Sequence, residues 1–67
     1  MKIFAERLKE LRIENNLTTI ELAEKLNVKN PTISRWENEV QIPNIEYLYK
    51  IAKLFNVTSD YLIGLEN

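Results

Sequence analysis

The sequence predicts an all-α protein, in which five short helices form a single domain over residues 1–67. One glycine and two prolines leave few positions for the tight turns that many short strands would require. Apolar residues recur at helical spacing, and asparagine, which commonly closes a helix, follows several of these apolar runs. The 45% hydrophobic content, with nine basic and ten acidic side chains, is typical of a folded globular domain.

The composition also excludes several classes of function. The chain has no cysteine and no histidine, so it offers no disulfide, no zinc site built on these residues, and no thiol or imidazole for catalysis. Asp60 is the one aspartate and most glutamates fall on faces predicted to be solvated, so we expect no enzyme, no cofactor, no metal and no small-molecule substrate. No apolar run approaches the roughly 20 residues that span a bilayer, and the N-terminus lacks the apolar region of a signal peptide. We therefore expect a cytoplasmic protein that does not enter a membrane.

The first predicted helix covers about residues 3–15. Phe4, Leu8 and Leu11 are spaced by four and three residues, which places them on one face of a helix. The two asparagines at positions 15 and 16 tolerate the left-handed conformation that closes many helices. The sequence therefore indicates a helix end at this pair.

Thr18 begins a second helix, which runs to Leu26. Its hydroxyl can accept a hydrogen bond from the first turn, while Glu21, three residues later, can reach back to the Thr18 N–H as in a capping box. Leu17 and Leu22 occupy the positions of a hydrophobic staple. Together these residues predict where the helix starts and which side faces the core.

A third helix begins near residue 30 and extends to about residue 38. Lys29 is a poor N-cap and Asn30 a good one, while Pro31 suits the first turn, so either residue is a candidate for the cap. The connection between the second and third helices is only three or four residues long. A turn this short makes two helices cross steeply, and we predict a helix-turn-helix over about residues 18–38.

Residues 38–43 have no helical period, and Pro43 ends this loop. Asn44 can cap a fourth helix over Ile45–Phe55, and a short fifth helix covers about Ser59–Ile63 and ends at Gly64. The residues predicted to face the core are Phe4, Leu8, Leu11, Leu17, Leu22, Leu26, Val28, Ile33, Trp36, Ile45, Leu48, Ile51, Phe55, Val57 and Leu62.

The third helix has two distinct faces. A step of 100° per residue places Ile33, Trp36 and Glu37 on the inward side. The outward side is polar, short and free of acidic residues, and consists of Pro31, Ser34, Arg35 and Asn38.

That outward face has the chemistry of a base-reading surface. Arg35 can offer two donors to guanine, Asn30 can pair with adenine, and Ser34 can serve either. The alternative interpretation is an ordinary solvated helix face, and the net charge of −1 provides no overall attraction to nucleic acid. Against that alternative, the acids of the first half gather on the first two helices, at Glu6, Glu10, Glu14, Glu21 and Glu24.

Several segments together resemble one known family. They are Arg7–Arg12, Leu17–Thr18, Glu21–Leu26, Thr32–Asn38 and Asp60–Gly64, with Pro43, Leu48 and Ala52. On these residues, and over nearly the whole chain, the sequence resembles the lambda-repressor-like DNA-binding domain of the phage repressor and Cro (XRE) family. The resemblance implies a compact five-helix fold that binds double-stranded DNA.

The resemblance also implies individual roles. Taken together with the polar face, it makes Asn30, Pro31, Ser34 and Arg35 the expected base-reading residues. The expected contacts to phosphates are Thr19, Lys29, Asn38 and Asn44. Arg12 and Glu37 match a structural ion pair between the first and third helices of the family.

The chain departs from the family pattern at four positions. Thr19 replaces a common glutamine, and Glu39 places an acid where the family usually has glycine. Lys29 replaces a capping serine and could contact a phosphate instead. Pro31 has no amide donor, so it can read bases only by apolar contact, for instance with a thymine methyl.

We predict a sequence-specific transcriptional regulator, with repression favoured, that binds a pseudo-palindromic DNA operator as a homodimer. The predicted self-association surface is formed by Tyr61, Ile63 and Leu65, although simple packing of the last helix onto its own domain would explain them equally well. The alternative function is a protein-interaction module, such as an antitoxin-like or anti-repressor partner. Thr19, Glu39 and the net charge favour that alternative, whereas the acid-free face of the third helix disfavours it.

Overall fold

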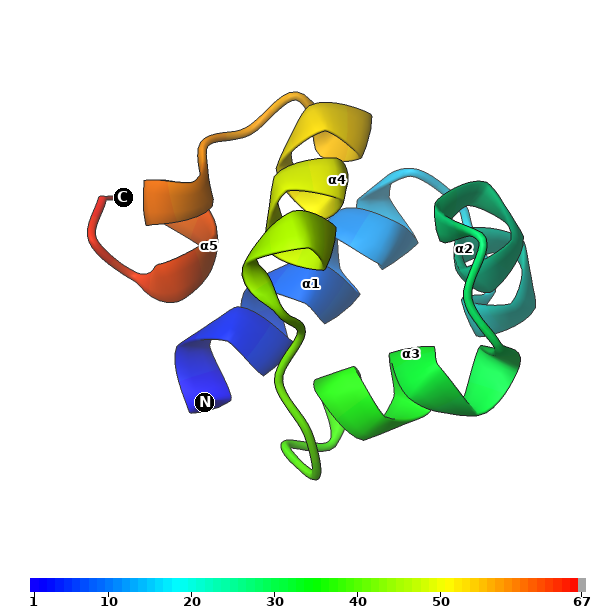
Figure 1. Ribbon diagram of the computed structural model, residues 1–67. Coiled ribbons are helices and arrows are strands. Elements are labelled where there is room, and N and C mark those ends of the chain that lie inside the picture. The colour runs from blue at the N-terminus through cyan, green and yellow to red at the C-terminus, as the bar shows by residue number, and fades with distance from the viewer. Residues whose placement is uncertain (67) are drawn as a thin grey trace.

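Five helices follow one another along residues 1–66, the part of the chain that the computed structural model describes (Figure 1). They are α1 (Lys2–Glu14), α2 (Thr19–Leu26), α3 (Asn30–Glu37), α4 (Ile45–Phe55) and α5 (Ser59–Ile63). The predicted all-α class is confirmed, and the expected bounds hold to within a residue or two. Within residues 1–66, no helix has the length and apolar character needed to cross a membrane.

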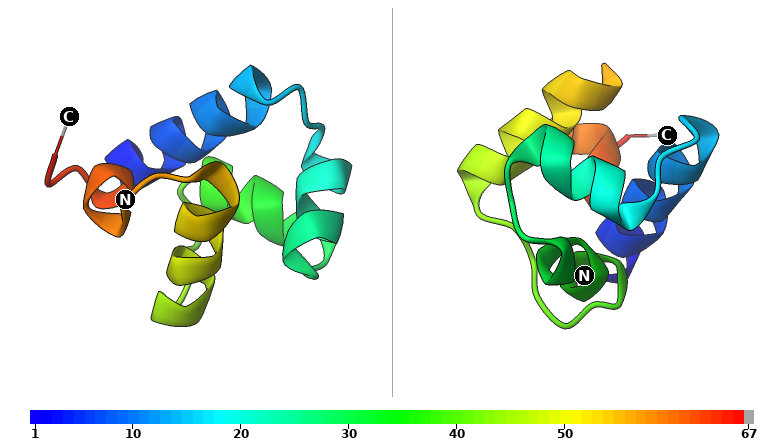
Figure 2. Two further views of the ribbon diagram at one scale, coloured as in Figure 1. Left: turned by 90° about the horizontal axis from the view of Figure 1, so that it is seen from above. Right: turned by 90° about the vertical axis from the view of Figure 1, so that its right-hand side faces the viewer.

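The helices enclose one core. α1 contacts both α3 and α5, while α2 contacts α3 and α4, and α4 contacts α5. Figure 2 shows α3 end-on in its right-hand view, with α2 crossing over it at a steep angle. This crossing is the helix-turn-helix expected over about residues 18–38.

Each helix ends in the same type of turn. The residue that closes it has a positive φ, and these residues are Asn16, Asn27, Glu39, Asn56 and Gly64. The N–H of the next residue then donates to the carbonyl five positions back, as from Val28 to Ala23 at 2.9 Å and from Val57 to Ala52 at 3.0 Å. This is the Schellman arrangement, in which a left-handed residue lets the chain satisfy the last carbonyls of the helix. It explains why connections of three or four residues are enough after α1, α2 and α4.

Three helices begin with a side-chain cap. Glu21 N donates to Thr18 Oγ1 at 3.1 Å and Thr18 N donates to Glu21 Oε1 at 2.9 Å, so the predicted capping box of α2 is confirmed. The Asn44 side chain caps α4 by accepting from Tyr47 N, and the Thr58 side chain caps α5 by accepting from Tyr61 N. Lys29 is the N-cap residue of α3 but makes no capping hydrogen bond, and Asn30 is already the first residue of the helix.

The buried cluster contains most of the predicted core. Leu8, Leu22, Ile33, Ile51 and Leu62 are completely buried. Partly buried residues packed against the cluster are Leu17, Val28, Tyr47, Leu48, Phe55, Val57 and Tyr61.

The prediction that Ile45 faces the core is wrong, because its side chain is 84% exposed. Ile45 shares a helix face with Leu48, as its spacing indicated. It is, however, the first residue of α4 and projects past the helices that cover the rest of that face. Together with Tyr49, which is also exposed, it borders a shallow apolar groove beside α4.

Candidate nucleic-acid interface

The turn between α2 and α3 places α3 on the outside of the fold. Asn27 adopts the left-handed conformation at φ 57° and ψ 46°, and Val28 packs against the core. Because only residues 27–29 separate the two helices, α3 must cross α2 instead of running beside it. Ile33 and Trp36, which are 0% and 2% exposed, then hold one side of α3 against the core.

The predicted base-reading residues lie on the other side of α3. Asn30, Pro31 and Arg35 are exposed, and Ser34 is half-buried. The Arg35 side chain makes no hydrogen bond or ion pair within residues 1–66, so its guanidinium donors are available to a partner. The helix phase expected from the sequence is therefore confirmed, and this face contains no acidic side chain.

The predicted phosphate contacts surround this face. Thr19 is half-buried at the first position of α2, while Lys29, Asn38 and Asn44 are exposed. Two of these side chains already make local hydrogen bonds. Asn38 Nδ2 donates to Ser34 O at 2.8 Å, and Asn44 Oδ1 accepts from Tyr47 N at 2.9 Å. Each amide keeps further donor capacity, because an NH₂ group carries two hydrogens.

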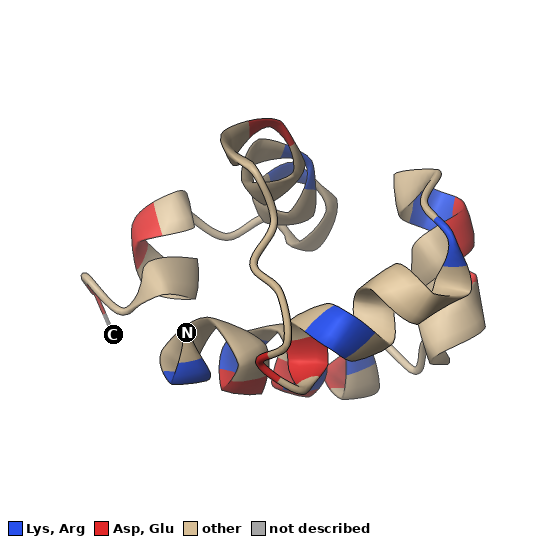
Figure 3. Ribbon diagram, turned by 60° about the horizontal axis from the view of Figure 1, so that its bottom comes forward, with Lys and Arg blue, Asp and Glu red and all other residues tan. Residues whose placement is uncertain are grey.

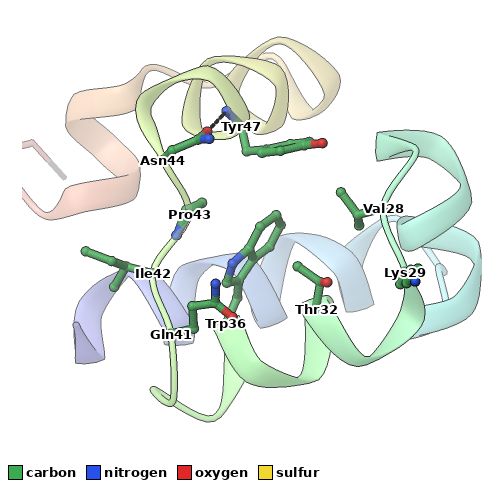
Figure 4. A pocket seen from close by; sticks show the side chains of 9 residues that line it. All are labelled: Val28, Lys29, Thr32, Trp36, Gln41, Ile42, Pro43, Asn44 and Tyr47. Atoms are coloured by element: carbon green, nitrogen blue, oxygen red, sulfur yellow. Dashed lines mark hydrogen bonds between the residues drawn. The ribbon is translucent and has the colours of Figure 1, made fainter.

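Lys29 and Asn44 belong to different elements but border the same space. Both line a cavity of about 400 Å³ between α3, the loop of residues 38–44 and the start of α4 (Figure 4). Thr19 and Asn38 are not among the residues that line it. Three other polar residues that line this space, Thr32, Trp36 and Gln41, were not predicted from the sequence as site residues. Trp36 was predicted to face the core on account of its apolar ring, and this prediction did not consider its N–H.

The ion pair implied by the family resemblance is present between α1 and α3. Arg12 Nε donates to Glu37 Oε2 at 2.7 Å and Arg12 Nη2 donates to Glu37 Oε1 at 3.1 Å. The two side chains are only 13% and 7% exposed, and Arg12 Nη1 also donates to Leu17 O at 3.0 Å. The hydrogen bonds that Arg12 donates to the Glu37 carboxylate raise the pKa of Arg12 above its ordinary value despite the opposing effect of burial. This pair fixes α3 relative to α1 and to the entrance of α2.

Charge is unevenly distributed around the interface. Figure 3 shows acidic and basic residues alternating along α1, while α3 carries one residue of each sign, Arg35 and Glu37. Because Glu37 is neutralised by Arg12, the free charge on α3 is positive. Glu39 is exposed in the loop that follows α3 and brings a negative charge toward the same region.

The predicted self-association residues lie at α5 and just beyond it. Tyr61 is half-buried, its ring lies 4.3 Å from the Arg7 guanidinium carbon, and its carbonyl accepts a hydrogen bond from Arg7. Ile63 is also half-buried, whereas Leu65 is 72% exposed. Packing within the domain thus accounts for much of Tyr61, and Leu65 leaves an apolar side chain at the surface.

Comparison with known proteins agrees with this geometry. The family described as Helix-turn-helix matches residues 8–62. The HTH-type transcriptional regulator ImmR of Bacillus subtilis is 42% identical over 88% of this chain and 46% of its own length. The HTH-type transcriptional activator BcrR of Enterococcus faecalis is 46% identical over 94% of this chain and 31% of its own length. The chain therefore spans less than half the length of these curated relatives.

A solved structure provides the same result for the fold. The P22 c2 repressor protein, crystallised in complex with a synthetic operator, superposes with a TM-score of 0.85 at 29% identity, covering 92% of this chain and 94% of that one. The sequence match, the shared helix order and the Arg12–Glu37 pair all agree. The chain belongs to the helix-turn-helix family of phage repressor and Cro (XRE) type.

Proposed function

We propose that this chain binds double-stranded DNA in a sequence-specific manner and regulates transcription, with α3 in the major groove. The observation that carries the proposal is the exposed, acid-free face of α3, held in place by the buried side chains of Ile33 and Trp36. A rigid helix with free polar side chains on its outer face suits the major groove, which admits one α-helix. The P22 c2 repressor, which has a similar fold, was crystallised with a synthetic operator.

The residues of α3 have different roles in this proposal. The free guanidinium of Arg35 donates to guanine, and Asn30, at the first position of α3, pairs with adenine. Pro31 has no N–H to donate and contacts a thymine methyl. Ser34 is half-buried, so its side chain reaches less far from α3 than those of its neighbours.

Residues around α3 hold the DNA backbone. Thr19, Lys29, Asn38 and Asn44 are the proposed phosphate contacts, and only Lys29 among them carries a positive charge. Because cations at phosphates release counterions, few cations mean a weak dependence of affinity on salt. A single copy should therefore bind DNA weakly.

A homodimer on a pseudo-palindromic operator would strengthen such binding. Two copies place two α3 helices on half-sites about one helical turn apart. Leu65 and the half-buried Ile63, beside Tyr61, are the proposed contact surface between copies. The proposed role is repression inside the cytoplasm, by occupation of the operator and without catalysis.

Selection from a random pool of duplexes tests this function directly. We expect the chain to enrich one half-site motif at low salt, and the Arg35→Ala variant to lose the preference at one base position. If no motif is enriched and purified duplexes do not bind, the proposal is wrong. A specific protein partner that occupies the α3 face would then support the interaction-module alternative.

A further inference from the structure

Leu65 departs from the pattern of most helix ends in this chain. An apolar residue follows the left-handed residue at each of these ends, and after α1, α2 and α4 it packs against the core, as Leu17, Val28 and Val57 do. Val40 after α3 and Leu65 after α5 are exposed instead, at 73% and 72%. The N–H of Leu65 donates to Asp60 O at 2.7 Å, and an apolar contact between two such residues is common. Because the acceptor here is an exposed aspartate, that position offers Leu65 no apolar partner.

The main chain around Leu65 is nevertheless held in place by Arg7, which projects from α1. Arg7 Nη1 donates to Glu66 O at 2.8 Å and also to Tyr61 O. The guanidinium carbon lies 4.3 Å from the centre of the Tyr61 ring, so a cation–π interaction supports the same group. One half-buried side chain therefore joins α1 both to α5 and to the residue that follows Leu65.

A second contact closes residues 64–66 against the start of α5. Glu66 Oε1 accepts a hydrogen bond from the Thr58 hydroxyl, which also caps α5 by accepting from Tyr61 N at 3.0 Å. Figure 1 shows that the chain turns back after α5, toward the start of that helix. Leu65 lies within this turn, so its side chain cannot move toward the core unless the hydrogen bonds on either side of it break.

The guanidinium of Arg7 binds main-chain acceptors instead of a carboxylate. Within residues 1–66 it forms no ion pair, and its hydrogen-bond acceptors are two carbonyl oxygens. A guanidinium presents its N–H donors in a fixed plane, whereas a lysine ammonium is a point charge on a flexible stem. The contacts of Arg7 therefore suit a residue that fixes the geometry of the main chain.

We propose that Arg7 is a positioning residue for self-association, because it holds Leu65 outward for contact with a second copy of the chain. An apolar side chain that is fixed before association loses less conformational freedom on binding, which strengthens the complex. In a two-fold symmetric dimer the same surface of both copies takes part, so the effect of Arg7 counts twice. This inference rests on the proposed function, in which two copies bind one operator and Leu65 lies between them.

The dissociation constant of the dimer, measured by sedimentation equilibrium, tests the role of Arg7. We expect Arg7→Met to raise this constant about tenfold, the effect of freeing about one side chain in each copy. Binding to a palindromic duplex built from the selected motif should weaken, while binding to a duplex with a single half-site should stay unchanged. Lys9→Met, an exposed lysine on the same helix, is the matched control for loss of one positive charge and should behave like the unmodified chain.

A double-mutant cycle separates positioning from stability. Leu65→Ser removes the exposed apolar side chain, so it should leave the melting temperature nearly unchanged but raise the dissociation constant at least as much as Arg7→Met does. If Arg7 acts through Leu65, Arg7→Met should have no further effect on this constant in the Leu65→Ser chain. Additive effects of the two substitutions, or a Leu65→Ser chain that dimerises like the unmodified one, would overturn the proposal.

Failure of this inference is distinguishable from failure of the proposed function. If Arg7→Met dimerises normally, or weakens binding to the half-site as much as binding to the palindromic duplex, the inference is wrong and the proposed DNA binding stands. If the unmodified chain binds no duplex, the proposed DNA binding fails, and the dissociation constants alone decide the inference. A chain that remains monomeric and binds two half-sites independently also overturns the inference, although it still binds DNA.

Discussion

Glu39 occupies a backbone position that other helix ends in this chain give to asparagine or glycine. Its φ is 63°, and the same turn is closed by Asn16, Asn27 and Asn56 at 56–57° and by Gly64 at 87°. The left-handed conformation brings Cβ close to the following carbonyl oxygen, and only glycine, and to a lesser extent asparagine, adopts it easily. The Glu39 carboxylate makes no hydrogen bond or ion pair within residues 1–66 that would offset this cost.

We therefore expect Glu39→Gly to stabilise the fold. The left-handed conformation costs a residue with a side chain about 1–2 kcal/mol, while the extra flexibility of glycine in the unfolded chain returns about 0.5–1 kcal/mol. The net gain is about 0.5–1 kcal/mol, which raises the melting temperature of a domain of this size by about 2–8 °C. Removal of a negative charge beside α3 should also strengthen duplex binding, more so at low salt.

Thermal unfolding followed by circular dichroism measures the effect on stability. Glu39→Ala is the matched control, because it removes the carboxylate but keeps a Cβ at the same φ. We expect its melting temperature to stay at or below that of the unmodified chain, while its duplex binding improves like that of Glu39→Gly. If Glu39→Ala stabilises the fold as much as Glu39→Gly does, charge and not backbone strain is responsible, and our reasoning is wrong.

Three further predictions follow from the same structure. Arg35→Ala should change stability by no more than about 0.5 kcal/mol but weaken binding to the selected site by about 1–3 kcal/mol. Arg12→Ala should instead cost about 3 kcal/mol of stability, because it leaves a buried carboxylate without its partner. Melting curves and duplex titrations that reverse this order would refute the assigned helix phase. Gly64→Ala should destabilise the fold by about 1–2 kcal/mol, since φ is 87° and the new Cβ would lie 3.2 Å from a side chain of α1; an unchanged melting temperature would contradict the strain. Hydrogen bonds from the backbone and the hydroxyl of Thr18 lower the pKa of Glu21. The stability they provide is therefore present above the ordinary carboxyl pKa and is lost as pH falls through the lowered pKa. Melting temperatures measured across the acid range should fall less steeply for Glu21→Gln than for the unmodified chain.

The sequence by itself determined the helices and the phase of each one. Thr18 and Glu21 form their capping box across three residues, and Asn27 closes α2 through a hydrogen bond made five residues back along the chain. Such contacts are local, so they depend little on how the helices pack. The same holds for the two sides of α3. The buried Ile33 and the exposed Arg35 follow from helical periodicity alone.

Only the tertiary structure decided what lies against each predicted face. Periodicity placed Ile45 on the apolar side of α4, but whether a neighbouring helix reaches that end depends on helix lengths and crossing angles, and none does. The cavity that joins Lys29 to Asn44 exists because the loop of residues 38–44 returns the chain past α3. The acceptors of Arg7, which come from α5 and from Glu66, are likewise brought to it by packing. A residue's type states that it can donate a hydrogen bond, but only the packing around it determines whether an acceptor is within reach.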